Sequence, residues 1–377
     1  PALMHLFVYV GFVLINIEVI EMVVDGAFDT HRFLSFLNFD GFHLYNFLIG
    51  FFEILAFLVT LGCVLFLIRR NVVHVKRLVM KELNGWPRTD ANLILISEIL
   101  IMSALFMMNI ADQGLQKLGN EHYPTVGSFP ITKFFIPLFT EMSEGNLIFI
   151  EKLSWWFHIV GVFGFLNYLI ISKHFHILLA FPNVFYSNLN PKGQFSNLQS
   201  VTNEVKAMLD TSFTPLPANP DAPVRFGAKD IFDLSWKQLL DSYTCTECGR
   251  CTSSCPANQT GKLLSPRKIM MDTRDRLEEV GKNIDKNKGK FIDDGKSLFG
   301  NYIIAEELWA CTSCNACVQD CPVNIDPLSI IIDIRRFLVM EQSAAPTELN
   351  LMFTNVENNG APWQFSHADR LNWAKLS

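Results

Sequence analysis

Eight of the nine cysteines fall into two copies of one pattern, in which three cysteines recur at intervals of three and a fourth follows, directly before a proline. The first copy holds Cys245, Cys248, Cys251 and Cys255, and the second holds Cys311, Cys314, Cys317 and Cys321. Three cysteines on one tight loop can bind three corners of an iron–sulfur cubane, and the fourth completes the other cluster. The pattern predicts two [4Fe–4S] clusters, with the ligand sets Cys245, Cys248, Cys251, Cys321 and Cys311, Cys314, Cys317, Cys255.

Two other uses of paired cysteines fit this pattern less well. A zinc ribbon uses two separated pairs and leaves the extra cysteines without a role. A disulfide framework conflicts with the cytoplasmic location derived below, because thiols stay reduced there. The ninth cysteine, Cys63, lies among Leu, Val and Gly and is expected to be a core residue rather than a ligand.

Histidines form a second group of candidate ligands. Five lie in or at the ends of apolar segments: His5, His43, His158, His174 and His176. Ionisable groups inside a membrane are costly and by default indicate a functional site. His158 and His176 are 18 residues apart. On one continuous helix they would share a face about 27 Å apart, and His174 would point elsewhere. Two haems stacked across a membrane need ligands in this arrangement.

The predicted topology pairs these histidines by depth. His5 and His176 would lie at the cytoplasmic ends of two spans, and His43 and His158 at the outer ends. Each pair predicts a haem b with two histidine ligands, so that one or two haems are expected. The alternative is that histidines at span ends merely suit the polar interface, as would be natural for His43 and His174.

The composition indicates that much of the chain lies in a membrane. Hydrophobic residues make up 50% of the 377 residues and charged residues only 18%. The net charge of −6 argues against nucleic-acid binding. A bilayer-spanning helix needs about 20 apolar residues. Segments of that length lie at 3–24, 42–68, 91–111 and 154–181.

The charges of the loops predict the orientation. The loop 69–88 carries six basic residues against one acid, Glu82, whereas the loops 25–41 and 112–152 carry more acids than bases. Because basic loops stay in the cytoplasm, the chain from residue 186 onward should be cytoplasmic. The apolar stretch 129–140 is too short to span and is expected to lie on the outer surface or to re-enter the membrane.

The expected fold class is all-α, with a transmembrane helical bundle and a helical cytoplasmic domain. Ser265-Pro266 and Asp326-Pro327 each combine an N-cap residue with a proline at the first helical position. No convincing alternating strand pattern is present. The expected domains are a membrane domain (1–185), a linker (186–228), a two-cluster domain (229–345) and a C-terminal extension (346–377).

Two stretches resemble known families. HLFVYVGFVL at 5–14 and FHIVGVFGFLNYLIISKHFHILLAFP at 157–182 are similar to the haem-binding helices of the γ (cytochrome b) subunit of respiratory nitrate reductase and of membrane subunits related to heterodisulfide reductase. The 55 residues between Cys255 and Cys311 have a helical pattern. This long spacer resembles the α-helical ferredoxin domain of succinate dehydrogenase iron–sulfur subunits and of the C subunit of heterodisulfide reductase.

The resemblance implies further expectations. The cytochrome b family has one span more than the four seen here, so a fifth is expected upstream of Pro1. Its first haem helix carries a second histidine where this chain has Ile15. The outer haem would therefore use another residue, such as His43, or be absent. The family's location is the bacterial cytoplasmic (inner) membrane, with the iron–sulfur domain on the cytoplasmic side.

The resemblance implies a function in electron transfer between a cytoplasmic redox partner and membrane quinone, either menaquinone or ubiquinone, through the clusters and haem b. The CCG motif of heterodisulfide reductase-type catalytic subunits is absent, so the partner would be a separate CCG-type iron–sulfur subunit or a flavoprotein. Glu53 and Glu98 could relay protons to quinone or simply bond to a neighbouring helix. Two alternatives stay open: a non-catalytic subunit that anchors and wires a larger respiratory complex, and a membrane-anchored ferredoxin without haem.

Overall fold

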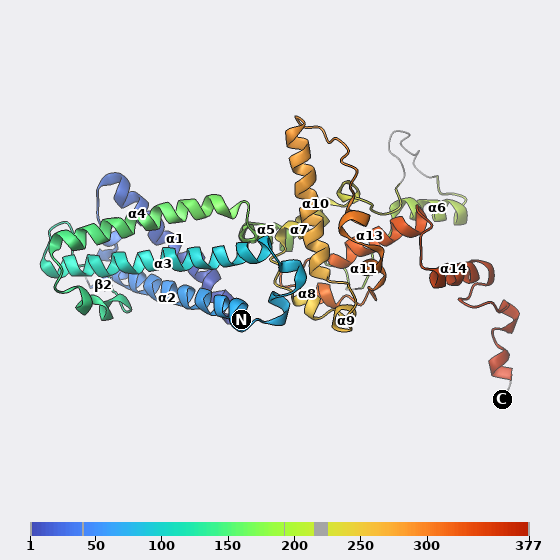
Figure 1. Cartoon of the computed structure of the whole chain (residues 1–377), viewed down its shortest axis with the longest axis horizontal. Coiled ribbons are helices and arrows are strands. Elements are labelled where there is room, and N and C mark those ends of the chain that lie inside the picture. The colour runs from blue at the N-terminus through green and yellow to red at the C-terminus, as the bar shows by residue number, and fades with distance from the viewer. Residues whose placement is uncertain (1, 40, 192, 215–224, 376–377) are drawn as a thin grey trace. The chain divides into compact units, whose positions relative to one another are not determined.

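The computed structural model describes residues 2–39, 41–191, 193–214 and 225–375. These residues are mostly helical (Figure 1), which confirms the predicted all-α fold class. Their strands form one antiparallel pair, β1 (Asn38–Phe39) and β2 (Phe42–His43), besides an isolated bridge between Phe299 and Ile303. The chain divides into two compact units, Pro1–Ile177 and Leu178–Ser377. The finer domain boundaries expected at 185, 228 and 345 stay predictions.

The first unit contains four helices that are long and apolar enough to cross a membrane. They are α1 (Ala2–Phe28), α2 (Leu44–Asn71), α3 (Trp86–Leu118) and α4 (Glu144–Leu169). The shortest, α4, has 26 residues and is therefore about 39 Å long, more than the roughly 30 Å of a bilayer's hydrocarbon core. The four helices correspond to the four predicted spans, and most of them extend beyond the predicted ends.

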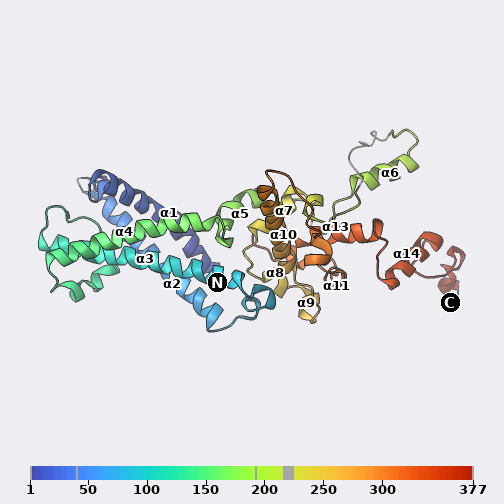
Figure 2. The same ribbon diagram turned by 45° about the horizontal axis from the view of Figure 1, so that its top comes forward.

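The four helices pack side by side in chain order, as Figures 1 and 2 show. α1 lies along α2, α2 contacts α3, and α3 lies along α4, whereas α1 and α4 touch over a much shorter length. Gly11 lets α1 approach α2, because a Cβ there would stand 2.3 Å from a methyl group of Val59. Cys63 is 1% exposed and lies in the core of this bundle, as expected from its surroundings in the sequence.

The fourth predicted span, 154–181, is not one continuous helix. α4 begins ten residues earlier, at Glu144, and ends at Leu169. The chain then turns, Ser172 caps a 3-10 turn η6 (Lys173–Phe175), and α5 (His176–Phe185) begins at His176. The expectation that His158 and His176 share one helical face was therefore wrong, because the helical period is interrupted between them.

Short turns connect the long helices. After α1 comes η1 (Phe33–Leu37), and after α2 come η2 (Lys76–Leu78) and η3 (Lys81–Leu83). Between α3 and α4 lie η4 (Thr132–Phe134) and η5 (Ile136–Phe139), in the stretch expected to lie on the outer surface or to re-enter.

This stretch folds back along α2 and partly re-enters the bundle. The backbone N–H of Gly127 donates to Asn46 Oδ1 at 2.7 Å, and the N–H of Ile131 donates to Glu53 Oε2 at 2.7 Å. Asn46 and Glu53 are two turns apart on α2, so that the loop descends about 10 Å along the helix. Glu53 also accepts a hydrogen bond from the hydroxyl of Thr132. Glu53 thus binds the loop between α3 and α4, whereas the sequence had offered a bond to a neighbouring helix.

The second unit is built around three helices, α7 (Trp236–Thr244), α10 (Pro266–Lys286) and α13 (Pro327–Met340). The Ser265 side chain accepts a hydrogen bond from the N–H of Lys268, and Asp326 accepts one from the N–H of Ser329, so both predicted helix starts are confirmed. The remaining elements are η7 (Ile231–Asp233), α8 (Arg250–Ser253), α9 (Pro256–Gln259), η8 (Leu298–Tyr302), α11 (Ala305–Trp309), α12 (Ala316–Gln319), α14 (Thr347–Asn359), η9 (His367–Asp369) and η10 (Asn372–Lys375).

The stretch predicted as a linker, 186–228, contains a helix and the start of the folded domain. Helix α6 (Gln199–Leu209) has no buried residue. Residues 215–224 lie outside the described residues. Gly227 has a φ of +106°, and a Cβ there would meet the backbone O of Asp333 at 2.2 Å, so a side chain cannot fit. The N–H of Ala228 donates to the same oxygen at 2.9 Å. This end of the stretch therefore packs against α13.

Candidate iron–sulfur and haem sites

The two cysteine loops repeat the same backbone conformation. In the first, Glu247 and Gly249 have positive φ angles and α8 follows; in the second, Ser313 and Asn315 have positive φ angles and α12 follows. A residue in the left-handed conformation turns the chain sharply. The third cysteine of each motif is then the second residue of the short helix that follows the turn. The repeat extends beyond the cysteine spacing to the shape of the loops.

The structure brings Cys255 to the second cysteine loop. A small cavity is lined by Cys255 together with Cys311, Cys314 and Cys317, and its other walls include Leu264, Leu328 and Ile331. The fourth cysteine of the first motif therefore faces the first three of the second. An apolar pocket with four thiols fits a [4Fe–4S] cluster with the predicted ligands.

Cys321 lies correspondingly near the first cysteine loop. Burial raises the pKa of the Cys321 thiol, and the neighbouring Cys248 adds to this shift. Burial also raises the pKa of Cys251 to about 12, with further contributions from Cys248, from Cys317 of the second loop and from Cys321. Crowded buried thiols of this kind stay protonated unless a metal centre stabilises the thiolates. The residues present therefore fit the predicted set Cys245, Cys248, Cys251 and Cys321.

The spacing of the cysteines over two loops is typical of a cubane. A zinc site would require four ligands around one point, whereas the four cysteines of a [4Fe–4S] cluster are spread over the cubane. Two sulfurs also accept backbone hydrogen bonds, Cys311 from Ser313 and Cys321 from Ile325, both at 3.4 Å. Such bonds help to set the potential of a cluster.

Arg335 supports the second loop from α13. Its guanidinium donates to the backbone O of Cys311 at 2.6 Å and to that of Leu308 at 2.5 Å, and it lies 4.9 Å from the centroid of the Trp309 ring. A positive charge beside a cluster favours its reduced form. Arg336 points elsewhere, because it pairs with Asp333 at 2.9 Å.

Replacing Arg335 with methionine should lower the midpoint potential of the second cluster and leave that of the first unchanged, because a nearby cation is lost. Redox titration followed by electron paramagnetic resonance would measure both. Arg336→Met, one residue along the same helix, serves as the matched control and should shift neither. An unchanged second cluster in Arg335→Met would contradict this placement of the charge.

Three histidines gather at one end of the membrane unit. The rings of His5 and His176 have centroids 6.4 Å apart, and those of His174 and His176 are 5.6 Å apart. An imidazole nitrogen lies about 2 Å from a bound metal ion, so that two rings on opposite sides of one metal have centroids on the order of 6 Å apart. The separation of His5 and His176 therefore fits two axial ligands of one haem. His174, which the sequence placed on another face, belongs to the same cluster because the helix is broken.

Asp90 of α3 holds the break that positions this cluster. Its carboxylate accepts hydrogen bonds from the Ser172 hydroxyl at 2.7 Å and from the N–H of Lys173 at 3.1 Å. Lys173 in turn donates from Nζ to the backbone O of Pro87 at 2.6 Å. The Nδ1 atom of His176 donates to the Lys173 backbone O at 3.0 Å, which leaves Nε2 for a metal. Sequence reasoning missed Asp90, although an acid at the start of an apolar helix was a visible signal.

The structure does not bring His43 and His158 together. His43 is exposed and precedes α2, where it pairs with Asn38 across the two-residue strands. His158 is 1% exposed and lies 14 residues into α4, about 21 Å from the start of that helix. The expectation that both lie at the same outer level was wrong, because α4 begins at Glu144 rather than near residue 154.

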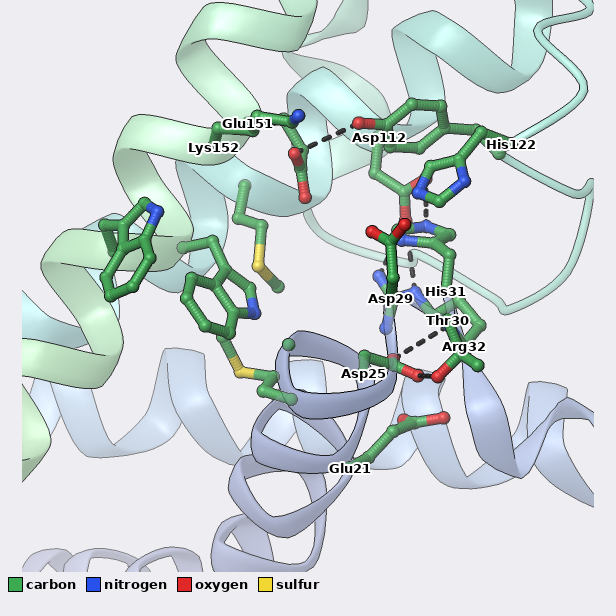
Figure 3. A pocket seen from close by; sticks show the side chains of 16 residues that line it. Glu21, Asp25, Asp29, Thr30, His31, Arg32, Asp112, His122, Glu151 and Lys152 are labelled. Carbon is green, nitrogen blue, oxygen red and sulfur yellow. Dashed lines mark hydrogen bonds and ion pairs between the residues drawn. The ribbon is translucent and has the colours of Figure 1, made fainter.

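A second polar centre lies at the other end of the membrane unit. A cavity of about 240 Å³ there is lined by residues of α1, α3 and α4 and of the loops between the helices. Figure 3 shows His31, Arg32 and Asp112 gathered beside it, with Glu151 on α4. Arg32 pairs with Asp112 at 2.8 Å, His31 contacts Asp112 at 3.2 Å, and Tyr123 donates to Glu151 at 3.1 Å. These groups already bond to one another and fix the loop after α1 to α3.

Comparisons with known proteins support the iron–sulfur assignment. A family model described as a 4Fe-4S dicluster domain matches residues 241–325, the span that holds both cysteine loops. The C subunit of the ferredoxin/F(420)H(2)-dependent CoB-CoM heterodisulfide reductase of Methanosarcina acetivorans is 30% identical over 120 residues, which cover 32% of this chain and 60% of that relative. No solved structure matches.

Two relatives match along nearly the whole chain. The probable iron-sulfur-binding oxidoreductase FadF of Bacillus subtilis is 27% identical over 399 residues, which cover 98% of this chain and 52% of the relative. The EtfAB:quinone oxidoreductase of Syntrophomonas wolfei is 27% identical over 398 residues, with 98% and 50% covered. The chain thus spans about half the length of these relatives.

Together these findings identify the chain as an iron–sulfur electron-transfer protein, related to iron–sulfur oxidoreductases and to the C subunit of heterodisulfide reductase, with four helices suited to a membrane.

Proposed function

We propose that this chain carries electrons between a cytoplasmic redox partner and membrane quinone, through two [4Fe–4S] clusters and one haem b. The observation that carries the proposal is that a single chain combines the two sets of four cysteines with a pair of histidines, His5 and His176, at one end of a four-helix membrane unit. Iron–sulfur clusters and a haem with two histidine ligands exchange single electrons. The protein sets the distances between them and their reduction potentials.

The residues of the chain would bind the clusters and the haem and hold them in place. The eight motif cysteines would hold the clusters against apolar residues of the second unit. His5 and His176 would hold the haem iron, and Asp90 would keep His176 in position through Lys173. Because Ile15 replaces a histidine and the structure does not pair His43 with His158, the residues present fit one haem rather than two.

The proposed orientation places the iron–sulfur unit in the cytoplasm. The basic residues between α2 and α3 support it, since such loops stay on that side. We further propose that the partner is an electron-transfer flavoprotein or a CCG-type iron–sulfur subunit. The name of the Syntrophomonas wolfei relative favours the flavoprotein. We place the protein in the bacterial cytoplasmic membrane, as a subunit of a quinone-linked oxidoreductase.

Rapid mixing of the anaerobically reduced, detergent-purified chain with a short-chain menaquinone analogue tests this function. Haem and cluster absorbance should both return to the oxidised form, and a quinone-site inhibitor should slow this return. In a Cys248→Ala/Cys255→Ala control, which should lack both clusters, chemically reduced haem should still be oxidised by the quinone. If the wild-type haem stays reduced in the presence of quinone, the chain is an anchor or wiring subunit without its own quinone site.

A further inference from the structure

A cavity inside the membrane unit is lined mainly by residues of α1, α3 and α4. All four long helices contribute to its walls, which are apolar except for three polar side chains, Asn16, Glu98 and His158. α1 and α4 approach each other on one side of it, where Gly26 of α1 packs against Trp155 of α4. The cavity is therefore a defined gap in the bundle rather than a space between separate bodies.

Glu98 is a buried acidic side chain in the wall of this cavity. The residue is only 9% exposed, and among the residues that the structure describes its carboxylate accepts no hydrogen bond and forms no ion pair. The other acid inside a span, Glu53, binds the loop between α3 and α4. An acidic side chain with no partner in a membrane interior is costly and indicates a functional role.

His158 presents a defined nitrogen. Its Nδ1 lies 2.9 Å from the backbone O of Ile101, and a carbonyl oxygen can only accept, so Nδ1 carries a hydrogen. In the neutral ring Nε2 is then an acceptor, and in the protonated ring it is a donor. His158 thus offers one atom that can both take and give a proton. The carboxyl group of Glu98 can do the same.

The cavity is accessible from the lipid and lies close to the histidine cluster. Asn16 is exposed and Leu166 is 46% exposed on the outside of the bundle. Phe12 and Phe165 line the cavity and also contact His174, with ring centroids 6.2 Å and 5.3 Å apart. A ligand in the cavity would be separated from the histidine cluster by one layer of aromatic side chains.

We propose that the head group of a lipid-soluble quinone binds in this cavity, and that Glu98 and His158 exchange protons with its two oxygens. The inference rests on the proposed quinone-linked function and assigns its site. Reduction of the quinone takes up two electrons, which a bound haem would supply, and two protons, one from the carboxyl group of Glu98 and one from the imidazolium of His158. The product is the quinol, and oxidation of quinol runs the same steps in reverse. His158 is then a quinone-site residue and not a haem ligand.

The test uses the full chain with its cofactors and compares three variants, Glu98→Gln, His158→Gln and Glu151→Gln. Positioned acid–base groups typically contribute factors of 10²–10⁴. The oxidation of reduced haem by the menaquinone analogue should therefore slow by about 100-fold or more in the first two variants. Iron and haem contents should equal those of the wild type. Glu151→Gln alters a buried carboxylate at the cavity of Figure 3 and should leave the rate unchanged.

Three results would overturn the inference. Loss of haem in His158→Gln would make this residue an axial ligand. A slow rate in Glu151→Gln with a normal rate in Glu98→Gln would move the site to the other end of the bundle. Normal rates in all three variants would exclude both cavities. In each case the wild-type chain still oxidises its haem with quinone, whereas a wild-type chain that does not would refute the proposed function itself.

Discussion

Replacing Cys255 and Cys311 together with alanine should leave about four of roughly eight irons, whereas replacing Cys248 and Cys255 should leave almost none. The reason is that Cys255 faces the second loop and shares its cavity with Cys311, so the first double variant damages one cluster only. The second double variant damages both, because Cys248 belongs to the loop that Cys321 completes.

Iron analysis and electron paramagnetic resonance of the reduced protein would measure this result. The resonance also reports whether the remaining cluster is intact, which controls for general unfolding. If each motif instead bound its own cluster, the two outcomes would be exchanged: the Cys248/Cys255 variant would keep four irons, or about half of the total, and the Cys255/Cys311 variant would lose all.

His5→Ala and His176→Ala should each reduce the haem content from about one per chain to almost none, because each removes one of two axial ligands. The iron content should not change, since the cysteines belong to the other compact unit. His174→Ala is the matched control. His174 lies 5.6 Å from His176 and is packed among aromatic side chains, but no ligand role is assigned to it.

Haem extraction and the reduced-minus-oxidised spectrum would measure these contents. A His174→Ala variant that loses its haem while His5→Ala keeps it would show that His174 is a ligand in place of His5. Haem present in all three variants would refute a histidine-ligated haem in this cluster.

Much of the second unit could be predicted from sequence because its signals are local. The cysteine spacing defines loops whose ligands converge, and the capping residues Ser265 and Asp326 act on backbone groups three residues away. Local rules of this kind need no knowledge of the rest of the fold. The four apolar segments were likewise visible, because the thickness of a bilayer sets their length.

The membrane site could be predicted only in part, because its geometry depends on contacts between distant segments. Ser172 and Lys173 end α4 early through hydrogen bonds to Asp90, about eighty residues away in the chain. Without that contact, the segment around His158 and His176 resembles one continuous helix. Glu53 and Glu98 look alike in the sequence, and only the re-entrant loop, which occupies Glu53 and leaves Glu98 unpaired among the described residues, distinguishes them.

The most direct test of the relay is a measurement of haem and non-haem iron on the same sample of detergent-purified full chain, together with its reduced-minus-oxidised optical spectrum. The account predicts about eight non-haem irons and about one b-type haem per chain, with both reducible. Eight irons without haem would contradict the relay and leave a membrane-anchored ferredoxin. Two haems per chain would contradict the assignment of His158 to the quinone site.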